Sequence, residues 1–343
     1  MPALSLLREQ ELAYRTQYAE LKERALGAGP LLPGTPGSLS LKAGTGHEYW
    51  YRVYYPVPGK RQEDLVCRSD DSDAEAAMRG RIEFAAWMQG QVVLLRKLGF
   101  QVADKGTARV LVELHNRGLF AAGLTVVGTL AYMAWLNEFG AMAVTARTQD
   151  VDLARRAPLE LAGPAKFIDV MTATRMPFVK VPALRLRAPS TSVKLPGAEG
   201  LRVDLLASGA RLGALIEVPE LEWFAQAVPH YDYLLADPQP AAMLAGGHCV
   251  PLRLPQPARM VWHKLYSSTE RKGFPEKAAK DRRQALTLAV ALSEHDAASL
   301  KHAFDAAPGR IRRSVSALKK VIAAGLDAHP QTAESMLALI GKA

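Results

Sequence analysis

Three aspartates stand where carboxylates could share a cation. Asp150 and Asp152 alternate with apolar residues in the segment 150–153, and a strand places residues i and i+2 on one face. Two carboxylates held together are costly unless a cation neutralises them, and hard oxygen ligands suit Mg²⁺. Asp204 is a lone acid in the apolar segment 201–206, where an unpaired buried charge would be expensive. It either belongs to the same site, lies at an exposed strand end, or pairs with Arg202.

The Asp-x-Asp spacing is weak evidence on its own. The chain has 15 aspartates, and Asp71 and Asp73 give a second match. That match lies in a polar segment without a strand pattern, so we interpret it as the entry to a helix. The pair at 150–152 gains weight only from its surroundings.

A glycine turn precedes the acidic pair. Val126-Val127-Gly128-Thr129 leads from an apolar strand directly into a helix. Gly128 permits a tight turn and close approach of a ligand, and Thr129 adds a hydroxyl beside the free N–H groups of a helix start, where phosphate oxygens bind well. The alternative is an ordinary strand-to-helix turn.

The segments around these residues predict alternating helices and strands. The assignments rest on the period of apolar residues and on bounding glycine and proline. Helices are expected over residues 4–27, 73–98, 106–117, 129–139, 276–293, 296–306, 308–324 and 331–340. Strands are expected over 123–127, 149–154 and 200–206, with a β-hairpin over 46–67 and a loop over 28–46.

Composition and charge bound the function. The 343 residues are 49% apolar and carry a net charge of +9, which is globular composition and excludes an acidic, disordered protein. Residues 257–343 hold 15 Lys and Arg against 8 Asp and Glu, so most of the surplus lies in the C-terminal quarter. That region is either a solvated helix face or a polyanion-binding surface.

Cysteines and hydropathy point to a reducing compartment. Cys67 and Cys249 are far apart in sequence, which predicts buried free thiols and not a disulfide framework or a metal knuckle. Neither a signal peptide nor a membrane span is expected. The predicted location is the cytoplasm.

Taken together, these motifs resemble the nucleotidyltransferase superfamily with the DNA polymerase β-type catalytic fold. Its hallmarks are a glycine turn between strand and helix, an Asp-x-Asp strand, and a third carboxylate on a later strand. Gly128-Thr129, Asp150 with Asp152, and Asp204 match them in that order. Supporting segments are residues 49–51, 147–152, 257–265 and 280–285. The chain looks most like a largely uncharacterised bacterial branch related to abortive-infection-type nucleotidyltransferases.

Two features depart from the family pattern. The turn is Gly-Thr where Gly-Ser or Gly-Gly is usual, and 20 residues separate Thr129 from Asp150. The hydroxyl of Thr129 keeps the chemistry of the turn, whereas the longer spacing requires a longer helix or an inserted loop over 140–146.

The resemblance implies an α+β fold, with a nucleotidyltransferase-like mixed sheet and flanking helices. The pattern of expected elements changes near residues 105 and 256, which divides the chain into an N-terminal helical and β-hairpin module (1–104), a nucleotidyltransferase catalytic core (105–255) and a basic C-terminal helical domain (256–343).

The resemblance also implies roles for the site residues. Asp150, Asp152 and Asp204 would be catalytic and would bind two Mg²⁺ ions, or Mn²⁺, with Asp204 helping to deprotonate the acceptor. The β- and γ-phosphates of a nucleoside triphosphate would lie on Gly128 and Thr129, with their charge met by lysine. We expect Lys264 first and Lys280 second in that role.

The implied reaction moves a nucleoside monophosphate to an acceptor hydroxyl and releases pyrophosphate. An RNA 3′ end such as that of tRNA suits the basic C-terminal region, and related abortive-infection toxins modify tRNA. A small molecule or a protein hydroxyl is an alternative acceptor. A different class of function is an inactive scaffold that binds RNA or nucleotide, and a further one is a helical nucleic-acid-binding protein with a chance Asp-x-Asp.

Several other polar and aromatic residues each have two interpretations. His263 either contacts phosphate or acceptor or is a packing residue, and Asp281 either serves the site or pairs with a nearby base on its helix. The aromatic residues of the expected hairpin either stack on bases or pack against neighbours; they are Tyr49, Trp50, Tyr51, Tyr54 and Tyr55.

Overall fold

The computed structural model describes residues 5–144, 148–163, 165–183 and 188–341. Helices and a central mixed sheet make it an α+β protein, which confirms the expected fold class. The first elements are β1 (Arg8–Glu9), α1 (Leu12–Gly27), β2 (Ser38–Ala43), β3 (Glu48–Val57), β4 (Lys60–Arg68) and α2 (Ser72–Lys97).

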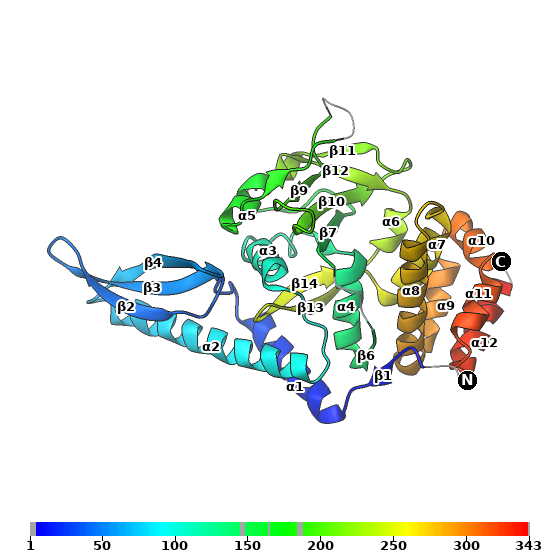
Figure 1. The fold of residues 1–343 in the computed structure, drawn as a ribbon, viewed down its shortest axis with the longest axis horizontal. Coiled ribbons are helices and arrows are strands. Elements are labelled where there is room, and N and C mark those ends of the chain that lie inside the picture. The colour runs from blue at the N-terminus through cyan, green and yellow to red at the C-terminus, as the bar shows by residue number, and fades with distance from the viewer. Residues whose placement is uncertain (1–4, 145–147, 164, 184–187, 342–343) are drawn as a thin grey trace.

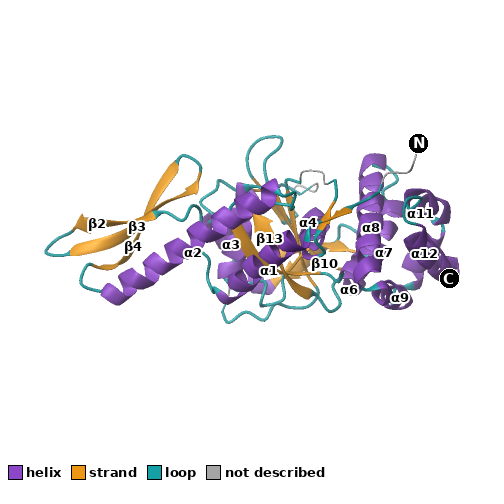
Figure 2. Ribbon diagram, turned by 90° about the horizontal axis from the view of Figure 1, so that it is seen from below, coloured by secondary structure: helices purple, strands orange, loops and turns teal. Residues whose placement is uncertain are grey.

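Strands β2, β3 and β4 form an antiparallel sheet that lies along α2. Both views show these four elements projecting from the rest of the molecule (Figure 1, Figure 2), and we call them the N-terminal arm (residues 38–97). Asp71 accepts a hydrogen bond of 3.0 Å from the backbone N–H of Ala74 and so caps α2. The second Asp-x-Asp match is therefore a helix entry, as expected.

The middle of the chain folds around a seven-stranded mixed sheet. Its main path is β11-β12-β10-β7-β5, and β9 pairs with β10 and with β8. The elements of this region are α3 (Lys105–Asn116), β5 (Thr125–Val126), α4 (Gly128–Glu138), β6 (Ala141–Met142), β7 (Asp150–Arg155), α5 (Phe167–Ala173), β8 (Val179–Lys180), β9 (Ser192–Lys194), β10 (Arg202–Ser208), β11 (Leu215–Val218), a 3-10 turn (Pro219–Leu221), β12 (Trp223–Val228), α6 (Tyr231–Leu234), β13 (Gln239–Ala245) and β14 (His248–Leu254).

The C-terminal part is helical and lies on the opposite side of the sheet from the arm (Figure 1). Its helices are α7 (Pro257–Glu270), α8 (Pro275–His295), α9 (Ala297–Asp305), α10 (Gly309–Ser316), α11 (Lys319–Gly325) and α12 (Pro330–Gly341). Helices α7 and α8 pack closely together and connect the sheet to the remaining helices. Among the residues that the structure covers, no helix is at once long and apolar enough to cross a membrane.

Three sequence expectations need correction. The first helix begins at Leu12, because residues 8–9 form a strand that pairs with β6; Leu4, where the helix was expected to begin, lies outside the described residues. The expected loop over 28–46 contains β2, whose residues pair with β3. The helix expected over 308–324 is divided into α10 and α11. The division of the chain at residues 104 and 255 stays a prediction.

Candidate active site

The two acidic strands lie next to each other in the sheet. Strands β7 and β10 are parallel, and their register sets Asp152 opposite Asp204 and Asp150 opposite Arg202. The alternating residues Val151 and Val203 are fully buried in the core on the other face. Because neighbouring strands are about 4.8 Å apart, the structure brings the three predicted carboxylates and one guanidinium onto a single face of the sheet.

The glycine turn lies against the same face. Strand β5 pairs with β7, and the Val127 N–H donates a 2.9 Å hydrogen bond to the Asp152 carbonyl. Gly128 has a φ of +68°, and a Cβ built on it would lie 2.1 Å from Asp152 Oδ2. Glycine is therefore required twice here, once for the left-handed backbone and once for the space that the carboxylate occupies. Thr129 follows in the first turn of α4 and is buried.

Asp204 is held by two neighbours. The Arg202 Nε donates to Asp204 Oδ1 over 2.8 Å, and the Ser192 hydroxyl of β9 donates to the same oxygen. Arg202 Nη2 also donates to Ser192 Oγ over 2.9 Å. The pairing with Arg202 that the sequence offered as one explanation of this lone acid thus exists, and it exists beside the other two carboxylates.

Negative charge accumulates at Asp152. Burial, followed by the charges of Asp204 and Asp150, raises the pKa of its carboxyl to about 6. The charges of Lys264 and Lys280 oppose that rise, so both predicted lysines lie within electrostatic reach of Asp152. A carboxylate with this environment favours any cation that can approach it.

The two lysines come from the packed helices α7 and α8. Lys264 is buried, with Nζ 3.3 Å from Asp281 Oδ1, while the Nε of Arg271 lies 2.6 Å from Asp281 Oδ2. Burial lowers the pKa of Lys264, and the Asp281 charge counters this effect. Lys280 is half-buried one residue before Asp281. Asp281 therefore pairs across the two helices, and not with the nearby bases on its own helix.

Comparison with known proteins assigns the family. A family model described as nucleotidyltransferase matches residues 105–308, more than half of the chain. The chain belongs to the nucleotidyltransferase family. A solved structure titled as that of the antibiotic-resistance factor ANT(2'')-Ia is also similar, with 15% identity and a TM-score of 0.30, over 66% of this chain and 95% of that one. A search of curated proteins found no match.

The carboxylate oxygens of this nucleotidyltransferase suit a divalent cation, although the side chains do not converge on a single cation position. No three acidic, imidazole or thiol side chains among the described residues form a ready metal-binding group. Asp204 turns one oxygen to Arg202 and Ser192, whereas the Asp150 carboxylate is exposed and makes no hydrogen bond or ion pair within the described part. The oxygens are of the kind Mg²⁺ prefers.

His263 is a packing residue in this structure. It is buried, its Nε2 lies 3.5 Å from the Pro229 carbonyl, and its ring meets that of Tyr231 edge-on with centroids 5.3 Å apart. Burial lowers its pKa to about 4, so the ring is neutral at pH 7. Among the hairpin aromatics, Tyr54 is buried and stacks against the Arg52 guanidinium.

The structure adds residues that the motifs did not contain. Ser192 lies in a proline-rich stretch without a clear period, and Arg271 ends α7 without any local signal of its partner. Tyr231 is buried near Asp152, whose charge contributes to raising its pKa after the larger effect of burial. Arg147, the first residue of the lead-in to the acidic pair, lies outside the described residues.

Proposed function

We propose that this nucleotidyltransferase moves a nucleoside monophosphate from a triphosphate to an acceptor hydroxyl, with Mg²⁺ bound by Asp150, Asp152 and Asp204. The observation that carries the proposal is the register of β7 and β10, with Gly128 against Asp152. Mn²⁺ is a second metal that these oxygens would accept. The cytoplasm remains the expected location.

Different residues of the chain would bind the phosphates, balance their charge and accept the proton. Gly128 and Thr129 would meet the β- and γ-phosphates at the start of α4. Lys264 and Lys280 would balance the charge of the triphosphate, with Asp281 holding Lys264 in position. Asp204, once released from Arg202, would accept the proton of the acceptor hydroxyl.

The reaction balances without any further reagent. The acceptor oxygen forms a bond to the α-phosphorus, the bond from that phosphorus to the oxygen bridging to the β-phosphorus breaks, and pyrophosphate leaves. When bound, Mg²⁺ would stabilise the charge that develops on the attacking and leaving oxygens.

An RNA 3′ end is the acceptor we favour. The turn between α7 and α8 follows Lys264 and precedes Lys280; Lys272 in this turn and Lys277 at the start of α8 are both exposed. Phe274, the last residue before α8, is 56% exposed, with Lys277 Nζ 5.2 Å from the ring centroid. An exposed ring among cations suits a stacked base and its phosphates. A small molecule and a protein hydroxyl are the acceptors that the experiment must separate from RNA.

The test is transfer from the four α-³²P-labelled triphosphates with Mg²⁺ or Mn²⁺. Total RNA, protein and small-molecule fractions of a lysate are offered separately as acceptors. We expect label in RNA of tRNA size, lost with EDTA and in Asp150→Asn/Asp152→Asn. Asp71→Asn/Asp73→Asn is the matched control, because it changes the other Asp-x-Asp match while asparagine still caps α2. Label on another fraction keeps the chemistry and changes the acceptor.

Substitution of Phe274 tests the proposed acceptor surface. Replacing Phe274 with alanine should weaken binding of a labelled single-stranded RNA about tenfold, as expected for one lost base stack, while Phe274→Trp keeps it. Leu212→Ala is the control, because Leu212 is also an exposed apolar residue, at 65%. Unchanged RNA anisotropy in the alanine variant would remove the turn from the acceptor site.

An inactive scaffold that binds RNA or nucleotide is the second candidate. The observation that favours it is that Arg202 and Ser192 both donate to Asp204 Oδ1, so that this oxygen is already occupied by protein donors. Triphosphate binding that is indifferent to Mg²⁺ and to Asp150→Asn/Asp152→Asn, with no transfer, would establish this candidate and exclude the first.

A further inference from the structure

A cavity of about 530 Å³ lies where the N-terminal arm meets α1, outside the candidate active site. Its apolar walls come mainly from two segments: Leu31 and Leu32 in the loop after α1, and Phe84 and Met88 on α2. The volume falls within the ~300–1,000 Å³ range of sites for small ligands. None of the residues assigned to the nucleotidyl transfer lines it.

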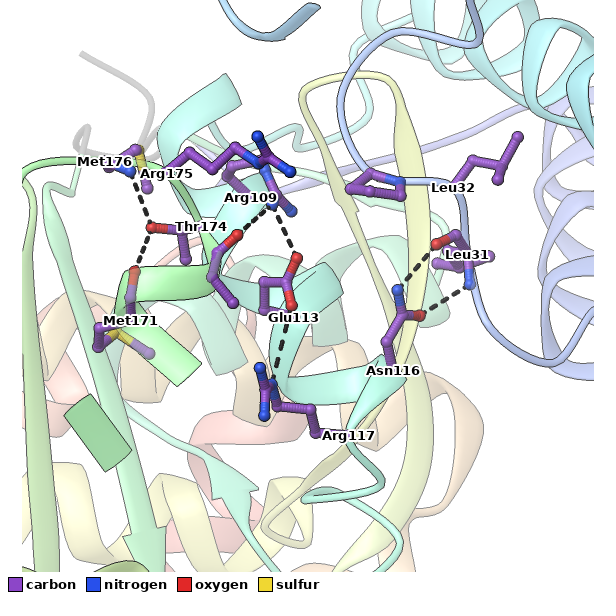
Figure 3. A network of polar contacts seen from close by, with 12 residues as sticks. Leu31, Leu32, Arg109, Glu113, Asn116, Arg117, Met171, Thr174, Arg175 and Met176 are labelled. Atoms are coloured by element: carbon purple, nitrogen blue, oxygen red, sulfur yellow. Dashed lines mark hydrogen bonds and ion pairs between the residues drawn. The ribbon is translucent and has the colours of Figure 1, made fainter. Parts of the chain in front are cut away.

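The wall formed by the loop is fixed to the catalytic core. The Asn116 side chain on α3 accepts from the Leu31 N–H and donates to the Leu31 carbonyl, both over 2.8 Å. Figure 3 shows this pair of hydrogen bonds, with Leu32 next along the loop. His248 Nε2 lies 3.0 Å from the Leu32 carbonyl, and His248 also lines the cavity. The cavity therefore has a rigid side, which reduces the entropy lost when a ligand binds.

Positive charge surrounds the cavity. Arg24 and Arg81 line it, and its described lining contains no carboxylate. The only hydrogen bond of Arg81 within the described residues is a 3.3 Å contact to the Pro30 carbonyl, and no ion pair involves it there. Arg24 pairs at 3.2 Å with Glu20, where both side chains are more than half exposed, so this pair neutralises little.

Two further arginines, Arg52 and Arg109, are outside the lining but within electrostatic reach of His248, which lines the cavity. Arg52 donates hydrogen bonds to three backbone carbonyls of the adjoining loop segment 33–36, and its guanidinium lies over the ring of Tyr54. Burial, with smaller contributions from the charges of Arg81 and Arg109, lowers the pKa of Arg52 to about 10 against the opposing charges of Tyr54 and Asp64. Arg109 is 3% exposed and pairs with Glu113 at 2.7 Å, yet its Nε and Nη1 have no hydrogen-bond partner among the described residues. Figure 3 shows Arg109 between Glu113 and the Thr174 segment.

We propose that this cavity binds a small, flat, apolar molecule that carries one anionic group. The aliphatic and aromatic walls would cover the apolar part, and the Arg81 guanidinium would pair with the anion. A charge-assisted hydrogen bond of this kind contributes about 1.5–3 kcal/mol, equivalent to at least tenfold in affinity. The inference is independent of the proposed nucleotidyl transfer.

Two glycines on α2 supply a matched pair of variants. Gly80 lines the cavity and Gly90 does not, and an added Cβ meets nothing within 4 Å at either position. Leucine at position 80 would fill the cavity, whereas leucine at position 90 would point into open space. Both changes replace a glycine inside a helix, so neither should lower the melting temperature.

The charged probe is 8-anilinonaphthalene-1-sulfonate, and the uncharged N-phenyl-1-naphthylamine is titrated in a parallel experiment. We expect one sulfonate probe per chain, and at least tenfold weaker binding in Gly80→Leu than in Gly90→Leu. Arg81→Gln should weaken the sulfonate about tenfold, as one lost charge-assisted bond predicts, and leave the uncharged probe unchanged. Arg79→Gln is the control, because Arg79 pairs with Glu75 outside the cavity.

Displacement identifies the anion. 2-Naphthoate and 1-naphthyl phosphate compete for the bound sulfonate probe, and the stronger competitor distinguishes a carboxylate ligand from a phosphate ligand. Equal probe affinity in Gly80→Leu and Gly90→Leu would overturn the proposal, as would equal loss of both probes in Arg81→Gln. Loss of probe binding as the chain self-associates at high concentration would assign the cavity to a second copy instead.

Discussion

Replacing Gly128 with alanine should separate the chemistry of the site from the stability of the fold. At a φ of +68° an alanine is strained, which costs roughly 1–2 kcal/mol of unfolding free energy. Its Cβ would also lie 2.1 Å from Asp152 Oδ2. Since non-bonded atoms need about 3.5 Å, the carboxylate has to move by more than an ångström, and a displacement of about 1 Å at a reacting group costs on the order of 100-fold in rate.

The control is Gly118→Ala. Gly118 has a φ of +71°, and a Cβ there meets nothing within 4 Å, so it carries the same backbone strain without the contact. Urea unfolding should show a similar loss of stability in both variants. Labelled nucleotide transfer, and Mn²⁺ binding followed by electron paramagnetic resonance, should fall only in Gly128→Ala. If both variants keep transfer and Mn²⁺ binding alike, Gly128 does not position Asp152 and the assignment of the site is wrong.

Two shorter predictions concern charge in and beside the site. Burial lowers the pKa of His263 from 6.5 to about 4. The neutral ring therefore contributes fully to the free energy of unfolding above pH 6.5, and this contribution is lost as the pH falls toward 4. The pKa difference between the folded and unfolded states corresponds to about 3 kcal/mol of unfolding free energy over that range. His263→Gln should therefore make the stability measured by urea unfolding depend less on pH between 6.5 and 4. An unchanged pH dependence would contradict the assignment of a buried, neutral ring. Replacing Arg202 with glutamine should raise the Mn²⁺ affinity about fivefold, close to the ~1 kcal/mol of a partly exposed ion pair; weaker Mn²⁺ binding would show that Arg202 supports the site instead of competing with the ion.

Alternating patterns predicted the strands of the site but not their neighbours. Period two in 150–153 and 201–206 placed Asp150, Asp152 and Asp204 on strand faces, and the pairing of β7 with β10 then aligned them. That pairing is a long-range contact, for which local periodicity carries no information. The family resemblance supplied it, and the family match to residues 105–308 supports the resemblance.

The missed elements have physical reasons. Strand β13 is almost fully buried, so its apolar run lacks the alternation that marks a half-exposed strand. Strand β2 follows a loop rich in glycine and proline, and its serines obscured the alternating Leu39 and Leu41. Ser192 and Arg271 act through partners on other elements, Asp204 and Asp281. Neither residue has a local signal that sequence alone could reveal.

The charges around the site suggest how metal and nucleotide would enter. Four carboxylates, Asp150, Asp152, Asp204 and Asp281, face four cations; these are Arg202, Lys264, Arg271 and Lys280. The protein alone is therefore nearly balanced. Divalent ions without nucleotide would leave the site positive, and a triphosphate without ions would leave it negative, whereas both together preserve the balance.

We therefore expect coupled binding of metal and triphosphate. A non-hydrolysable triphosphate should raise the Mn²⁺ affinity by about 10- to 100-fold, in the usual range of coupling free energies. By linkage, saturating Mn²⁺ should raise the affinity for the triphosphate by the same factor. Isothermal titration in both orders measures the two factors. Because free triphosphate also binds Mn²⁺, each titration is corrected for that equilibrium. Arg202→Gln should reduce the factor, since it removes one of the cations that substitute for the metal. Equal Mn²⁺ affinity with and without the triphosphate would refute the balance argument, whichever acceptor the enzyme uses.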